Sequence, residues 1–177
     1  MGERELTLFG GQGHIPQVSM VTSSERSMEI TAHFSGCWDG EEGVLLSAGE
    51  NLGGYTLYIK SGRLVYEHVR YGARHVVEGA MQKGAKRCSL VMHVGGDKSA
   101  RAKLFVDRRG IGEGHVPRVS SHLSFWGLDL GRDGGKPVSQ AYDAPFAFPD
   151  SKLDRVVMRF FEEVEANELA AALEAVE

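Results

Sequence analysis

Histidine and tyrosine side chains are the first candidates for acid–base chemistry in this sequence. None of the seven histidines stands in an H-x-H or H-E-x-x-H spacing, so no histidine metal motif is evident. A two-residue turn at Ser61-Gly62 would pair Tyr55 with His68 and place Tyr66 on the same face. An imidazole beside two phenols is either a hydrogen-bonded core histidine or the base of a pocket. Burial would keep the ring neutral near pH 7, as a general base needs. The core interpretation is favoured, and the pocket interpretation is the alternative.

A small-molecule site, if the chain has one, is expected on this tyrosine–histidine face rather than on the loop 129–143. The face continues into apolar Leu57, Ile59 and Leu64, which would exclude water and strengthen polar contacts at the rim. The predicted ligand-binding residues are Tyr55, Tyr66, His68 and Trp126, and the candidates for catalysis are His68, Tyr66 and His93. A register slip of one residue would send the hairpin residues to the opposite face.

Three aspartates, Asp129, Asp133 and Asp143, lie in a glycine-rich stretch and offer the hard oxygen ligands that calcium takes. Their spacing lacks the full pattern of an EF-hand loop and its closing glutamate. Aspartates in such loops also accept hydrogen bonds from backbone amides. We therefore expect no cofactor, with calcium at these three residues as the alternative.

The two cysteines, Cys37 and Cys88, belong to no C-x-x-C pair, which argues against a zinc ribbon or a thioredoxin-like site. The first residues lead into no apolar run of the signal-peptide type. We therefore expect two reduced thiols and a cytoplasmic location.

Short stretches of alternating apolar and polar residues, separated by glycine-rich turns, position these side chains. In residues 28–34, for example, Ile30 and Ala32 share a face that Glu29 and Thr31 do not. The same reading predicts strands over 28–34, 43–47, 55–69 (a hairpin), 88–94, 101–107, 111–116, 123–130 and 153–160. Short strands at regular spacing, with no helix between them, predict an all-β fold: an antiparallel β-sandwich or barrel.

The two ends of the chain depart from the strand pattern. Residues 1–27 are glycine-rich and then polar, so they are expected to form an arm before a β-sandwich domain over 28–161. Residues 162–177 switch to the helical period and predict a C-terminal helix. Its apolar stripe must pack on the chain's own sheet or in a homo-oligomer; the stripe consists of Ala166, Leu169, Ala170, Leu173 and Val176.

Composition excludes several classes of partner. The formal charge is −4 at pH 7, which argues against general nucleic-acid binding, because such proteins carry a basic field. No apolar run is long enough to span a bilayer. Hydrophobic residues make up 42% of the chain, enough for a packed core of one domain.

Three stretches resemble the C-terminal domain of bacterial arylsulfatases and related sulfatases: residues 42–68, 102–118 and 127–148. The last is the most specific, because it holds in order Asp129, Gly131, Asp133, Gly135, Pro137, Val138, Tyr142, Pro145 and Phe146. The resemblance implies a concanavalin A-like, laminin-G-like jelly roll and a structural role for the aspartates.

Sulfatase activity itself is not expected. The family nucleophile is a cysteine or serine in C/S-x-P-x-R, and neither Cys37 nor Cys88 begins such a string. We therefore expect a non-catalytic, sulfatase-tail-like module that binds a small ligand, such as a saccharide, or a protein partner of the sulfatase type. The alternative is a small cofactor-independent enzyme of the lyase, isomerase or cyclase type, using a His/Tyr acid–base pair on the concave sheet face.

Overall fold

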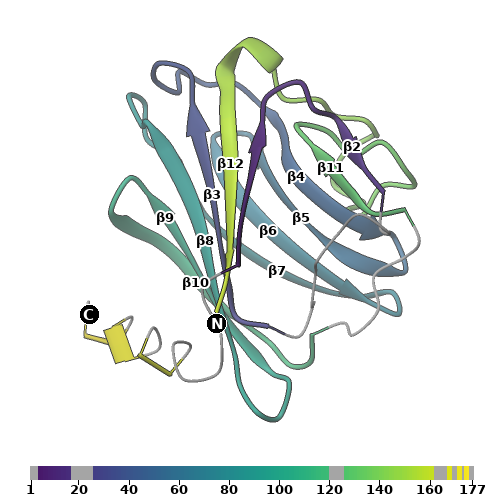
Figure 1. The fold of residues 1–177 in the computed structure, drawn as a ribbon, viewed down its shortest axis with the longest axis vertical. Helices are drawn as coiled ribbons and strands as arrows, with labels where there is room; N and C mark the ends of the chain where they lie inside the picture. The colour runs from purple at the N-terminus through teal and green to yellow at the C-terminus, as the bar shows by residue number, and fades with distance from the viewer. Residues whose placement is uncertain are drawn as a thin grey trace.

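The computed structural model describes residues 4–16, 26–119, 126–161, 167–168, 171–172 and 174–175, which form an almost all-β fold (Figure 1). The strands are β1 (Arg4–Phe9), β2 (His14–Ile15), β3 (Met28–Phe34), β4 (Gly43–Glu50), β5 (Gly53–Lys60), β6 (Arg63–Arg70), β7 (Ala73–Ala80), β8 (Arg87–Val94), β9 (Ala100–Val106), β10 (Arg109–Val116), β11 (Leu128–Leu130) and β12 (Leu153–Phe160). A short 3-10 turn, η2 (Asp150–Lys152), precedes β12.

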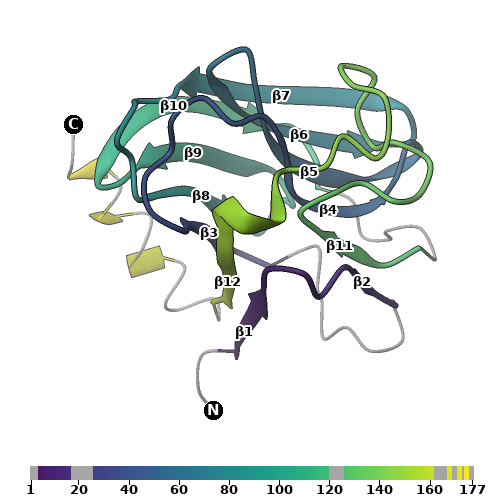
Figure 2. The same cartoon turned by 90° about the horizontal axis from the view of Figure 1, so that it is seen from above.

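The described strands form two six-stranded antiparallel sheets (Figure 2). Sheet A has the order β1-β12-β3-β8-β9-β10, and sheet B has the order β2-β11-β4-β5-β6-β7. Sheet A brings together strands from distant parts of the chain, since β12 lies between β1 and β3. The arrangement is a jelly-roll β-sandwich, which confirms the predicted fold class.

The β5–β6 hairpin has the register that the sequence predicts. Ser61 and Gly62 have φ angles of 52° and 72°, the left-handed pair that a two-residue type I′ turn requires. Tyr55 therefore lies opposite His68, and Tyr66 pairs within the same hairpin. This turn fixes which face of sheet B every hairpin side chain occupies.

Alternation along the strands fills the space between the sheets. Ile30 of β3 and Leu90 of β8 are fully buried, as are Leu57 and Leu64 of the facing sheet. Burial of each such side chain stabilises the fold by about 1.5–3 kcal/mol. The polar residues between them on sheet A are consequently directed to the outer side.

The two sheets approach each other closely where the edge strand β7 runs beside β10 (Figure 2). A Cβ atom added at Gly112 would lie 2.4 Å from the carbonyl oxygen of Glu78, and one at Gly79 would lie 2.3 Å from that of Ile111. Only glycine permits such an approach, so these two glycines close the sandwich along this side.

The segment 131–149 covers part of the outer face of sheet B. Tyr142 and Phe146 pack against Val44, Tyr58 and Val65 of that face. This cluster buries part of the outer face of sheet B, whereas the outer face of sheet A carries two hollows.

Three strands, β1, β2 and β7, differ from the sequence expectation, and β2, like β1, falls within the expected N-terminal arm. Strand β7 was not predicted, because as an edge strand it buries a single large apolar side chain, Val77, and lacks a clear alternation. Strand β1 falls within the expected N-terminal arm, yet it pairs with β12 and buries Leu8. The predicted strand 123–130 is represented by β11, and residues 120–125 lie outside the described residues.

The C-terminal segment has a helical backbone where it is described, at residues 167, 168, 171, 172 and 174. The predicted apolar stripe of Ala166, Leu169, Ala170, Leu173 and Val176 lies outside the described residues. Glu174 forms an ion pair of 3.1 Å with Arg101 of β9. Within the described part of the chain, no helix is long and apolar enough to cross a membrane.

Candidate functional site

The outer face of sheet A holds a row of three basic side chains on adjacent strands. Arg155 of β12 lies opposite His33 of β3, and His33 lies opposite Arg87 of β8. Neighbouring strands are about 4.8 Å apart, so the three residues form a continuous line across the sheet. We call Arg155, His33 and Arg87 the basic row.

A second row, with three hydroxyl-bearing residues and one valine, runs beside the basic row, two positions away along the strands. Thr7, Val157, Thr31 and Ser89 follow one another across β1, β12, β3 and β8. The hydroxyls of Thr31 and Ser89 lie 3.1 Å apart. These groups can both donate and accept hydrogen bonds.

The next row alternates in charge. Arg159 of β12 lies between Glu5 of β1 and Glu29 of β3. Its Nε donates to Glu5 Oε2 at 3.0 Å, while Glu29 Oε1 accepts from the Thr31 hydroxyl at 3.2 Å. The two carboxylates thus have partners on the protein, and each keeps a second oxygen that can accept a further hydrogen bond.

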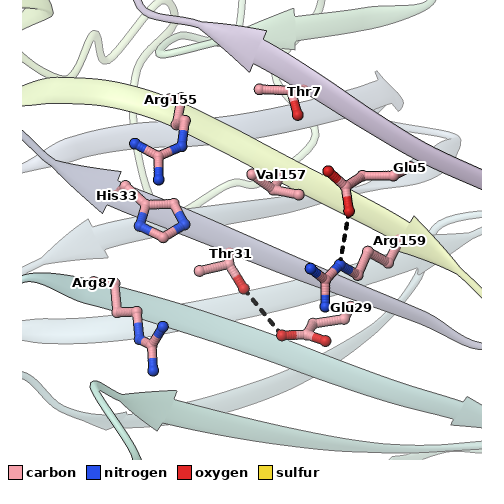
Figure 3. A pocket seen from close by; sticks show the side chains of 9 residues that line it. All are labelled: Glu5, Thr7, Glu29, Thr31, His33, Arg87, Arg155, Val157 and Arg159. Atoms are coloured by element: carbon pink, nitrogen blue, oxygen red, sulfur yellow. Dashed lines mark hydrogen bonds and ion pairs between the residues drawn. The ribbon is translucent and has the colours of Figure 1, made fainter.

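Side chains of the three rows enclose an open hollow of about 320 Å³ (Figure 3). The lining residues are Glu5, Thr7, Glu29, Thr31, His33, Arg87, Arg155, Val157 and Arg159. Three arginines stand against two glutamates, so with a neutral His33 the hollow carries one net positive charge.

A second hollow of about 260 Å³ adjoins the first toward β9. The two hollows share Glu29, Thr31 and Arg87. The second is completed by Ser89, Val91, Phe105, Asp107 and Arg108.

The imidazole of His33 is held toward its neutral form. Its pKa is lowered from 6.5 by partial burial and then by the positive charges of Arg155 and Arg87, while Asp154 opposes this shift. Arg155 also pairs with Asp154 at 2.5 Å. Arg87 differs, because its guanidinium makes no hydrogen bond or ion pair to any described residue. The basic row therefore keeps unused donors at its Arg87 end.

The face predicted from the sequence as a ligand site lies inside the sandwich. Tyr66 and His68 are fully buried and Tyr55 is 3% exposed. The Tyr66 hydroxyl lies 3.0 Å from Nδ1 of His68 and 3.3 Å from the sulfur of Met92. The His/Tyr pair of the enzyme alternative exists, but it is closed to a substrate, so the structure favours the core interpretation.

Burial accounts for the titration behaviour of this core group. It lowers the pKa of His68 from 6.5 to about 4, with smaller contributions from His75 and Arg70. It raises the pKa of both Tyr55 and Tyr66 above the usual tyrosine value. All three groups are therefore uncharged at neutral pH.

The other two predicted site residues, His93 and Trp126, lie apart from the hollows. His93 is half-buried on β8, opposite Arg101 of β9. Trp126 donates its indole N–H to Asp129 Oδ2 at 2.6 Å, and its ring lies 4.8 Å from that of His14. The structure therefore does not bring the predicted ligand-binding set together.

Two of the three aspartates named as alternative calcium ligands accept hydrogen bonds from the protein. Asp129 accepts hydrogen bonds from Trp126, from the Gly134 amide at 2.8 Å and from the His14 ring at 2.8 Å. Asp133 accepts from the Tyr142 hydroxyl at 2.6 Å and from the backbone of its own loop, while Asp143 is exposed. Among the described residues no group of three metal-ligating side chains is found, and Asp129 and Asp133 accept hydrogen bonds that shape the loop.

Sequence reasoning missed the basic row because its members stand far apart in the chain. Residues 33, 87 and 155 lie side by side only because β12, β3 and β8 are neighbours in the sheet. No local sequence pattern predicts that order. The signal that could have found these residues is the alternating pattern, because each of the three occupies the polar face of its strand.

No family model and no curated protein sequence matches the chain. Solved structures match its fold. The carbohydrate-binding module CBM40 of a Ruminococcus gnavus sialidase, bound to α2,3-sialyllactose, aligns with a TM-score of 0.56 and 14% identity over 95% of this chain and 97% of that one. Mouse laminin α1 domains LG4-5 align with a TM-score of 0.58 and 18% identity over 90% of this chain and 42% of that one. The chain shares their β-sandwich fold. At these identities the likeness concerns the fold alone, and it does not establish the sulfatase-tail resemblance.

Proposed function

We propose that this chain is a non-catalytic binding module that takes an acidic saccharide into the larger hollow on sheet A. The observation that carries the proposal is the basic row, in which the Arg87 guanidinium has no partner among the described residues. A guanidinium presents paired donors that match a carboxylate or sulfate, so Arg87 is the expected anchor for the acidic group.

The neighbouring rows supply contacts that suit a sugar. Thr7, Thr31 and Ser89 offer hydroxyls, and Glu5 and Glu29 offer carboxylate oxygens that accept from sugar hydroxyls. The hollow is open and polar, which suits a hydrated ligand better than an apolar one. The fold likeness to a sialidase module that binds sialyllactose supports the same ligand class.

Titration by isothermal calorimetry tests the proposal, with N-acetylneuraminic acid, glucuronic acid and neutral galactose as ligands. We expect the acidic sugars to bind and galactose to bind at least tenfold more weakly. Arg87→Gln should weaken acidic-sugar binding about 10- to 150-fold, because a hydrogen bond to a charged group contributes about 1.5–3 kcal/mol. Arg63→Gln, on sheet B, is the matched control and should leave the affinity unchanged. Equal binding of galactose and the acids, or an unaffected Arg87→Gln variant, would contradict the proposal.

Three further properties are proposed from the sequence alone: a cytoplasmic location, self-association, and a relation to sulfatase tails with a sulfatase-like partner. The last rests on the motif within 127–148. Size-exclusion chromatography with light scattering, on the full chain and on a variant lacking 162–177, tests self-association, and loss of a dimer in the shortened chain is the expected result.

A further inference from the structure

We infer that the ligand extends over both hollows, with its acidic unit at the basic row and a neutral sugar unit against Phe105. This inference rests on the proposed function and names the class of saccharide: a glycan with a single acidic end followed by neutral sugar. It excludes a polysaccharide with a charge on every unit.

The two hollows form one path across the strands. They share Glu29, Thr31 and Arg87, so no wall of other residues separates them. From Arg155 on β12 to Phe105 on β9 the path crosses three strand spacings, which is about 14 Å at about 4.8 Å each. That span exceeds one monosaccharide ring, so a single acidic sugar would leave the second hollow unfilled.

The charge of the second hollow differs from that of the first. Arg87 and Arg108 stand there against Glu29 and Asp107, so the formal charges balance. Asp107 is fixed in place, since its Oδ1 accepts from the backbone amides of Lys86 at 3.0 Å and Arg87 at 3.3 Å. These two carboxylates would repel a second anionic group, whereas a neutral sugar would experience no such repulsion.

Phe105 gives the second hollow an aromatic ring, with the Lys103 ammonium 5.9 Å from the centre of that ring. The half-buried Phe105 ring lies opposite Ser89 on one side and Gly110 on the other. Gly110 has no side chain, and even an added Cβ there would lie 3.9 Å from the ring. Val91 adds a second apolar contact to this hollow. The C–H face of a neutral sugar can pack on this surface while its hydroxyls reach Ser89.

Two pairs of probes test the inference: N-acetylneuraminic acid with 3′-sialyllactose, and glucuronic acid with glucuronosyl-β1,3-galactose. For the pair whose acid binds, we expect the longer glycan to bind about threefold to tenfold tighter than the acid alone, the range that a stacked ring contributes. Phe105→Ala should abolish this difference and leave the affinity for the acid alone unchanged. Arg87→Gln should weaken both members of a pair.

The controls separate the two proposals. Phe105→Leu keeps apolar bulk and guards against misfolding of the alanine variant. Tyr71→Ala, at an exposed position in the turn between β6 and β7, should change neither affinity. If no acidic sugar binds the wild-type protein, both the proposed function and this inference are wrong. If acids bind but the longer glycans gain nothing, or if Phe105→Ala weakens acid and longer glycan equally, only this inference is overturned. Tighter binding of a heparin hexasaccharide than of either longer glycan overturns it too.

Discussion

Protonation of His68 should destabilise the protein in mild acid. The imidazole is fully buried, and its pKa falls from 6.5 to about 4 mainly because burial disfavours the charged ring. Unfolding restores the ordinary pKa, so between about pH 6.5 and pH 4 the unfolded chain binds a proton that the folded chain does not. The stability that depends on the neutral ring is therefore complete above pH 6.5 and is lost as the pH falls. With these two pKa values, His68 lowers the free energy of unfolding by about 2–3 kcal/mol between pH 7 and pH 4.5.

Urea unfolding followed by tryptophan fluorescence at both pH values measures this loss. His68→Gln keeps a polar partner for Tyr66 but does not titrate, so it should lose about 2–3 kcal/mol less than the wild type on acidification. His115→Gln, at an exposed position, is the control and should behave as the wild type. Carboxylates titrate in all three proteins alike and cancel in the comparison. Equal acid losses in wild type and His68→Gln, or an NMR titration of His68 near pH 6.5, would refute the buried neutral ring.

Three shorter predictions concern other parts of the molecule. Acidic-sugar binding should strengthen from pH 8 to pH 5.5, because a bound anion favours the charged form of His33 that Arg155 and Arg87 oppose, and calorimetry on His33→Gln should show a flat profile. Gly112→Ala should lower the free energy of unfolding in urea by about 1–3 kcal/mol through its clash with the neighbouring strand, while Gly110→Ala should be nearly neutral. Asp129→Ala should cost about 1–3 kcal/mol for unsatisfied donors beneath its loop, measured by thermal unfolding, and exposed Asp143→Ala should cost little.

Local sequence patterns predicted the β5–β6 hairpin correctly but missed the edge strands β1 and β7. The Ser61-Gly62 turn and the alternation around it specify one register, and the structure has that register. Strand β7 was not predicted, because half of its residues are exposed and apolar side chains do not alternate clearly along it. Strand β1 pairs with the far end of the chain, and a six-residue stretch carries little evidence of such a distant partner.

The candidate site could not be assembled from the sequence because it depends on sheet order. Alternation shows that His33 and Arg87 point to the outer side of their strands, but not that β3 and β8 are neighbours or that β12 joins them. For Tyr66 and His68, the register of the hairpin was enough to predict the contact between the two side chains. Their burial was not predictable in this way, because it depends on how the second sheet packs over them.

Stability alone does not account for the basic row. Arg155 and Arg87 lie on either side of His33, and their positive charges disfavour protonation of its ring. Elsewhere the fold gives its buried charges partners, as with Arg74 and Glu67 at 2.7 Å. The inner faces of both sheets are filled, and part of the outer face of sheet B lies under the segment 131–149. The outer face of sheet A carries an open hollow beside these cations, and an anion bound between Arg155 and Arg87 would be attracted by both.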